Sequence, residues 1–190
     1  MAIPTDELQK ANPSAKIELF ELHLVAALHG STDVSRFHNG VNMNSNADVV
    51  FQGATYTRIP IEANGFEYSA TTTTVPRPTL RISNLLSQVT ALMIQANLTT
   101  PKNDLNGAKF IRKVTMLKFL DNANFSGGVN PYGTPANNTY DDQTFFIDRK
   151  TLESLEFVEF ELASALDLTN RRAPKRIITR KDFPSVGTFR

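Results

Sequence analysis

The chain contains no cysteine among its 190 residues. Disulfide bonds, thiolate metal sites and a cysteine nucleophile are therefore all excluded. The three histidines, His23, His29 and His38, show no HExxH or comparable ligand spacing. His23 and His29 are close enough in sequence to be considered together, but a solvated histidine, or one at the edge of the core, is the ordinary interpretation. We predict no metal site and no cofactor.

Long apolar runs are also missing. The longest apolar stretches, such as residues 22–28, fall far short of the roughly 20 residues that cross a bilayer. The polar start, residues 1–13, lacks the basic and then apolar pattern of a secretory signal. We therefore expect the protein to be made in the cytosol and kept there, or built into an assembly that forms there.

Motifs for catalysis and nucleotide binding are absent as well. The sequence has no GxxxxGK[ST], GxGxxG or GxSxG segment, and Gly127-Gly128 lacks the strand-to-helix context of a phosphate loop. The acids considered for a catalytic pair or a cation site are Asp104, Asp121, Asp141, Asp142 and Asp148. Asp141-Asp142 lacks the DxDxDG pattern of a calcium loop, which favours solvated loop acids. We predict that the protein is not an enzyme; the rival, an enzyme acting on cell wall or DNA, would need acids or histidines clustered in a pocket.

Charge is distributed unevenly along the chain, although the formal net charge is only +1. The last 20 residues hold seven basic side chains and one acid, so residues 1–170 carry 13 basic and 18 acidic side chains. The seven are Arg171, Arg172, Lys175, Arg176, Arg180, Lys181 and Arg190. Such a tail indicates attraction to an acidic partner surface or to nucleic acid, with a merely solubilising tail as the alternative. We predict a β-rich domain, residues 1–170, and a basic C-terminal tail, residues 171–190.

Apolar residues make up 41% of the chain, which is enough for one sizeable core. Their pattern predicts strands over residues 17–28, 48–51, 54–61, 109–120, 144–150 and 154–164, and a short strand at Leu80 and Ile82. Gln52-Gly53 predicts the turn of a hairpin. The apolar phase slips within residues 17–28, which indicates a bulge or a strand buried on both faces.

One helix is predicted over residues 85–96, capped by Ser83 or Asn84. Its apolar residues recur at helical spacing, so one face should pack on a sheet. Seven or eight short strands, one helix and no parallel βαβ alternation predict a mainly β (α+β) protein. We expect a β-sandwich or a partly closed β-barrel with the helix packed on it.

Two polar segments interrupt the predicted strands. Residues 30–46 are expected to be an excursion between strands, and residues 121–143 are rich in Asn, Gly and Pro. A structureless loop as long as the second is uncommon unless it has a function, and we interpret it as a contact with a neighbouring subunit. The strand over residues 109–120 has no purely apolar face, as expected for a strand bordering a subunit interface.

Three stretches resemble one known family. The first is Asn64-Gly65-Phe66-Glu67, followed by a threonine-rich run and the segment RPTLRISNL, which begins at Arg77. The second is Arg112-Lys113-Val114 with Phe119-Leu120-Asp121 and Asn124-Phe125, and the weaker third is the strand at 155–162 leading to residues 171–178. In order and spacing they resemble the minor tail protein L family of lambda-like siphophages, over about residues 17–178.

The resemblance implies a tail-tip or baseplate hub component that joins the end of the tail tube to the central fibre or spike, usually in rings of three. It also implies β-rich modules related to tail tube proteins. Longer family members continue into a C-terminal portion whose cysteines hold an iron–sulfur cluster, and we expect this chain to stop near where that portion would begin. Without cysteine, cluster binding carries over to no residue here, so that role would fall to another polypeptide or to the basic tail.

We therefore expect a virion structural protein at the tail tip, assembled in the host cytoplasm. It should form a homo-oligomeric ring, with a trimer favoured over a hexamer, and contact other tail-tip, tail-tube and central-fibre proteins. The residues predicted to lie at interfaces are Arg77, Arg112, Lys113, Asp121, Asn124, Phe125, Arg171, Arg172, Lys175 and Arg176. For Arg77, fixation by a carboxylate within the fold and a contact between subunits both stay open.

A nucleic-acid-binding module acting through the basic tail is the alternative function. The tail places Phe183 and Phe189 beside its cations, and such modules mix basic residues with exposed aromatic ones. No recognisable DNA- or RNA-reading motif accompanies them. Affinity for duplex DNA that falls steeply with salt would distinguish this alternative from the structural role.

Overall fold

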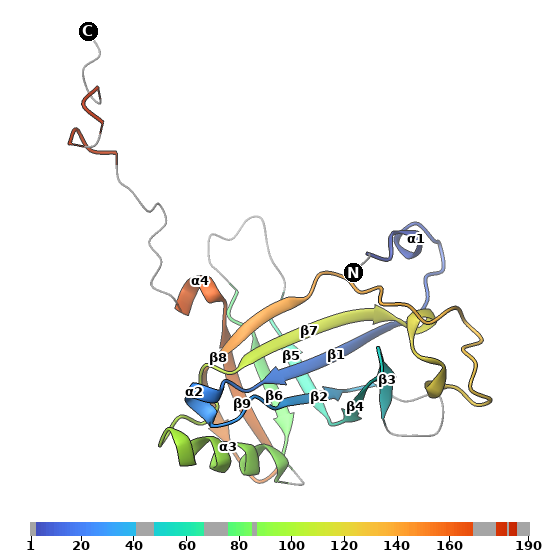
Figure 1. The fold of residues 1–190 in the computed structure, drawn as a ribbon, viewed down its shortest axis with the longest axis horizontal. Coiled ribbons are helices and arrows are strands. Elements are labelled where there is room, and N and C mark those ends of the chain that lie inside the picture. The colour runs from blue at the N-terminus through green and yellow to red at the C-terminus, as the bar shows by residue number, and fades with distance from the viewer. Residues whose placement is uncertain are drawn as a thin grey trace.

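The computed structural model describes residues 3–40, 48–66, 76–84, 87–168, 178–181 and 183–185. Within these ranges, nine strands form one open sheet in the order β3-β4-β2-β1-β7-β8-β9-β6-β5 (Figure 1). The strands are β1 (Lys16–His23), β2 (Val34–His38), β3 (Val49–Phe51), β4 (Ala54–Arg58), β5 (Ile61–Asn64), β6 (Thr79–Ser83), β7 (Lys109–Met116), β8 (Gln143–Glu153) and β9 (Phe157–Ala163). The predicted mainly β fold is confirmed, with nine strands in place of seven or eight.

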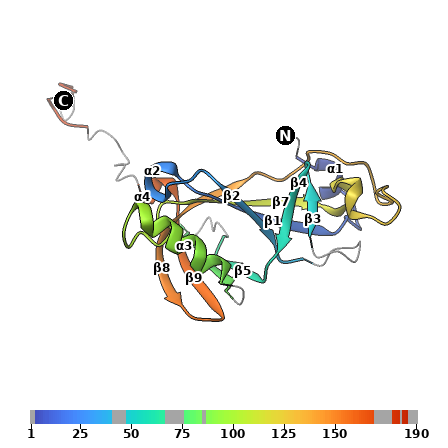
Figure 2. The same cartoon turned by 60° about the horizontal axis from the view of Figure 1, so that its bottom comes forward.

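The described helices are short apart from α3 (Gln88–Thr99). Single turns form α1 (Thr5–Leu8), α2 (Ala26–His29) and α4 (Ala165–Leu168), and 3-10 turns form η1 (Leu117–Phe119) and η2 (Asn122–Asn124). In the described part of the chain, no helix has the length and apolar character needed to cross a membrane. Figure 2 shows α3 beside β8 and β9 at one end of the molecule.

The predicted packing of the helix is confirmed, but its predicted cap is wrong. Described α3 starts at Gln88, with Ser87 as N-cap at φ 52° and no side-chain capping bond. Asn84 instead accepts a hydrogen bond from the Thr90 amide at 3.3 Å and donates to the Ser154 carbonyl at 3.3 Å. Its carboxamide thus pairs with an amide in the first turn of α3 and ties the helix to the β8–β9 turn, although Asn84 is not the N-cap.

β1 explains the slip in apolar phase, because it is buried on both faces. Phe20 and Leu22 belong to the main core, which β5, β6, β7, β8, β9 and α3 complete. Leu19 belongs to a second core under the β3–β4 hairpin. β1 pairs with β2 and β7 in regular register. Burial on both faces, and not a bulge, therefore produces the slip in apolar phase.

Several predicted boundaries were wrong. The strand predicted over 54–61 is divided between β4 and β5. The strand predicted over 17–28 ends at His23, and the chain turns into α2, where the Val25 amide donates to His29 Nδ1 at 2.9 Å. The polar excursion at 30–46 contains β2, which pairs with β1 despite its polar composition; residues 41–47 lie outside the described residues. The strand predicted over 109–120 ends at Met116 and continues as η1.

The predicted hairpin is confirmed. β3 and β4 pair antiparallel, and the two turn residues both have positive φ, 55° at Gln52 and 73° at Gly53. This is the backbone of the tight turns that match the right-handed twist of paired strands. Glycine at the second position adopts it without strain.

The sheet curves so that β5 and β6 lie across the main core from β1, but it does not close. The chain passes from β4 to β5 through Ile59 and Pro60 alone. The Ile59 amide donates to the His38 carbonyl, at the end of β2, at 3.1 Å. β3 and β5 are the two end strands. A partly closed arrangement follows, in which no other described strand pairs with the outer edge of β5.

Candidate assembly surfaces

Arg77 lies among three carboxylates. Its guanidinium is 3.2 Å from Asp148 on β8, 2.9 Å from Glu161 on β9 and 2.7 Å from Asp167 on α4. Hydrogen bonds from Arg77 and then Arg149 hold the pKa of Glu161 below its usual value. Arg77 is thus fixed by carboxylates within the fold, which was one of its two predicted roles; a role between subunits stays a prediction. The contact to Asp167 fastens α4 to the sheet just before the basic tail.

Arg112 and Lys113 lie on opposite faces of β7 and both pair with β1. Arg112 is 2.7 Å from Glu18 and donates to Gln143 on β8 at 2.7 Å. Lys113 is 3.1 Å from Glu21. The mixed polarity of this strand therefore has an explanation within one subunit, because carboxylates of the neighbouring strand neutralise both cations. Their predicted interface role remains untested.

Glu21 is the centre of a buried polar cluster on β1, with only 5% of its surface exposed. Burial opposes its ionisation, but hydrogen bonds from Tyr56, His23 and Lys113 outweigh burial and lower its pKa to about 2. The Tyr56 hydroxyl donates to the carboxylate at 2.6 Å. Burial raises the pKa of the nearby Asp142. This cluster braces β1 against β4 and β7.

Asp121, Asn124 and Phe125 hold the β3–β4 hairpin. Asp121 accepts a hydrogen bond from the Gly53 amide at 2.7 Å. Asn124 accepts from the Val50 amide at 2.7 Å and donates to the Val50 carbonyl at 2.6 Å. Phe125 is buried in the second core. These three predicted interface residues thus attach the long loop to the hairpin within one subunit, and a further role in assembly stays a prediction.

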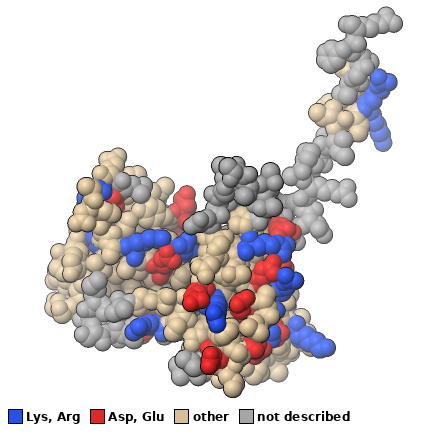
Figure 3. All heavy atoms as spheres, turned by 180° about the vertical axis from the view of Figure 1, so that it is seen from behind, with Lys and Arg blue, Asp and Glu red and all other residues tan. Residues whose placement is uncertain are grey.

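Four predicted interface residues, Arg171, Arg172, Lys175 and Arg176, lie outside the described residues. In the described part of the tail, Ile178 is 67% and Phe183 is 45% exposed. On the body, the face seen in Figure 3 carries basic and acidic side chains interleaved with one another. That face of the body therefore presents mixed charge, whereas the excess of positive charge resides in the tail sequence.

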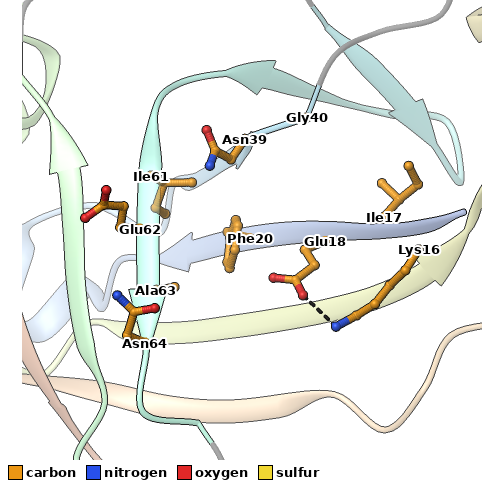
Figure 4. Close-up of a pocket in the computed structure, with 10 residues that line it drawn as sticks. All are labelled: Lys16, Ile17, Glu18, Phe20, Asn39, Gly40, Ile61, Glu62, Ala63 and Asn64. Carbon is orange, nitrogen blue, oxygen red and sulfur yellow. Dashed lines mark ion pairs between the residues drawn. The ribbon is translucent and has the colours of Figure 1, made fainter.

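A polar groove lies beside β5, an end strand of the sheet, where β5 crosses β1 (Figure 4). It encloses about 570 Å³ and is lined by Lys16, Ile17, Glu18, Phe20, Asn39, Gly40, Ile61, Glu62, Ala63 and Asn64. Glu18 in its floor is 2.7 Å from Lys16 and 2.7 Å from Arg112. A second hollow of about 580 Å³ shares Lys16, Ala63 and Asn64 and extends along β5 to Gly65 and Phe66.

The long loop, which was predicted to contact a neighbouring subunit, carries an uncharged surface whose residues the sequence analysis did not name. Residues 122–140 include no Asp, Glu, Lys or Arg, although 21% of the chain is charged. Val129 and Tyr132 are 65% and 58% exposed, while Asn130 between them is buried. The absence of charge over this stretch was the signal that could have marked it, since the centres of protein interfaces are depleted in charge.

An apolar cleft opens beneath α3 at the other end of the molecule. It encloses about 240 Å³ between α3, β2 and the end of β4, and Phe37, Ile59, Val89 and Leu92 are among its lining residues. Among the described residues that line it, Arg36 is the one charged side chain, and its Nε is 3.7 Å from Glu21. This cleft was also missed, because residues distant in sequence form it.

The described residues hold no group of three or more His, Asp or Glu side chains that could bind a metal ion. Three of the five acids considered for catalysis have separate partners: Asp104 is 2.9 Å from Lys150, Asp148 pairs with Arg77, and Asp121 accepts from the hairpin. These acids therefore contribute to bracing contacts in different parts of the fold.

Comparisons with known proteins identify the class of this protein as a structural protein of bacteriophage tails. Residues 27–190 match the family model described as phage minor tail protein L. The chain is also 32% identical, over 133 residues, to tail tip protein L of Escherichia phage lambda. That match covers 68% of this chain and 51% of the relative, so the chain spans about half the length of the curated relative it matches. The chain belongs to the phage minor tail protein L family, which confirms the resemblance drawn from its motifs.

Proposed function

We propose that this chain is a structural component of the tail tip, where it forms a ring that connects the tail tube to the central fibre or spike. The printed name of its lambda relative, tail tip protein L, supports the tip location. A trimer is the favoured ring and a hexamer the alternative. Other tail-tip, tail-tube and central-fibre proteins are its partners, and residues 1–170 and 171–190 act as body and basic arm.

The open edge of β5 is the observation that carries this proposal. Among the described strands, β5 pairs only with β6. Two adjoining hollows, of about 570 and 580 Å³, lie beside it. An uncovered edge offers backbone donors and acceptors to another chain, and soluble proteins usually protect such edges. An extended segment of a neighbouring tail protein would complete the sheet by adding a strand.

The first experiment is to label the chain in intact phage particles and to measure the mass of the purified chain. We expect the label at the distal end of the tail by electron microscopy, and a mass by light scattering that corresponds to a ring or to its subunit. A protein that is absent from particles would refute the proposed function.

A matched pair of variants tests the groove itself. Asn64 lines both hollows and is exposed, so Asn64→Trp should obstruct them and lower incorporation into tails. Asn12→Trp makes the same change at an exposed position on the N-terminal segment and should incorporate like the original chain. Equal incorporation of the two variants would show that the groove beside β5 is not needed for incorporation into tails.

The nucleic-acid alternative is tested on the same preparations. The structural role predicts no salt-sensitive affinity for duplex DNA, and it predicts that deleting residues 171–190 harms assembly. Tail-dependent binding to duplex DNA that falls steeply between low and physiological salt would support the alternative instead.

A further inference from the structure

We propose that the uncharged loop of one copy, residues 126–135, docks in the cleft beneath α3 of the next copy, with Tyr132 as the central residue. This inference rests on the proposed ring and names the two surfaces that would join its subunits.

The loop is held in place before any partner arrives. The Asn130 side chain donates toward the carbonyls of Lys118 and Leu120, each at 3.1 Å, and accepts from the Tyr132 amide at 2.9 Å. The Phe125 and Tyr132 rings lie 5.9 Å apart, so the exposed tyrosine leans on a buried ring. A preorganised loop loses little conformational entropy on binding, which favours affinity.

The exposed side chains of this loop are suited to an interface. Tyr132 and Val129 present apolar surface with no charged residue between positions 122 and 140. Tyrosine is enriched among the residues that dominate binding energy, and charged residues are depleted at interface centres. The partner surface should therefore be concave, apolar and nearly neutral.

The cleft beneath α3 has this character. Its volume of about 240 Å³ admits one aromatic side chain, and its lining includes Phe37, Ile59, Val89 and Leu92. Arg36 is 37% exposed at its side chain, and its Nε is 3.7 Å from Glu21, which also pairs with Lys113 at 3.1 Å. The uncharged loop places no further cation beside Arg36, whereas a basic segment would be repelled by it.

The positions of loop and cleft select a second copy as the occupant. In Figures 1 and 2 the loop lies at the end of the molecule opposite α3, so one chain cannot bring its own loop into its own cleft. Two different surfaces at opposite ends give a head-to-tail contact, and such contacts close into rings when the rotation between subunits permits.

The absence of cysteine makes a direct test possible. In this chain, Val129→Cys and Gln88→Cys together introduce one cysteine at the loop and one at the cleft rim. Mild oxidation should produce a ladder of multimers that ends at the ring. Equal amounts of the two single variants, mixed, should yield mainly the dimer that joins one chain of each. Crosslinks only between identical cysteines, or none, would overturn the proposal.

A second variant measures the contribution of the tyrosine. Tyr132→Ala should weaken self-association about 30-fold or more, as expected for a central interface residue, with the subunit still folded. Thr134→Ala, a control in the same exposed loop, should associate like the original chain. Unchanged association of Tyr132→Ala, in a chain that still locates to the tail tip, would refute this docking while leaving the proposed function standing.

Discussion

Glu21→Gln gives the sharpest test of the bracing clusters, because it removes one buried charge and keeps the shape of the side chain. Glu21 receives hydrogen bonds from Tyr56 at 2.6 Å and His23 at 2.9 Å, and pairs with Lys113 at 3.1 Å. These contacts lower its pKa from 4.5 to about 2. At about 1.4 kcal/mol per pKa unit, the ionised carboxylate contributes at most about 3 kcal/mol to the free energy of unfolding at neutral pH.

The pH dependence follows from the direction of this shift. The pKa is lower in the folded than in the unfolded state, so the stabilisation is complete well above pH 4.5 and is lost as the pH falls toward 2. About 2 kcal/mol of it should be gone by pH 3. Glu21→Gln should therefore lower stability most at pH 7, and its difference from the original chain should shrink as the medium is acidified.

Urea unfolding between pH 3 and pH 7 measures both effects. The control is Glu62→Gln, since Glu62 is 66% exposed at its side chain and is 3.8 Å from Arg81. An exposed pair of this kind contributes little, so the control should follow the original chain throughout. A Glu21→Gln variant with the same loss at pH 3 as at pH 7 would refute the argument.

Three further changes test other contacts. Asn130→Ala should lower the free energy of unfolding by about 2 kcal/mol in urea, because buried carbonyls of the loop lose their donor; an unchanged midpoint would show that water replaces it. Gly53→Ala should cost about 1 kcal/mol at φ 73°, and Gly53→Asn less, by thermal unfolding; equal stability of the two variants would contradict the turn geometry. Arg77→Gln leaves three carboxylates without their shared cation, so limited proteolysis should cut next to α4 several-fold faster, and an identical cleavage rate would separate Arg77 from the anchoring of α4.

The local parts of the fold were predictable because they depend on neighbouring residues. Gln52-Gly53 between two short extended runs predicted the hairpin, and the alternation over residues 155–162 predicted β9. The helix was predicted from its spacing, but its start was not. The Asn84 carboxamide is engaged with Thr90 and Ser154, and the second of these contacts depends on where the β8–β9 turn lies.

The predicted interface residues show where sequence reasoning reached its limit. The motifs correctly indicated the family, yet Arg112, Lys113 and Asn124 each have partners within the subunit. A pattern can show that a charge lies on a strand that is partly buried, but not whether its partner is in the same chain or the next. The uncharged loop around Tyr132 was readable from composition, whereas its exposure was not.

The sequence by itself determined the family, the mainly β class, the absence of thiol chemistry and the basic tail, because each follows from composition or from patterns within a few residues. The tertiary structure alone decided which groups meet. Arg77 contacts carboxylates that are 71, 84 and 90 positions away, and the cleft beneath α3 draws on residues from Leu22 to Phe160. Strand order and register bring such residues together, and neither is encoded in the period of a single segment.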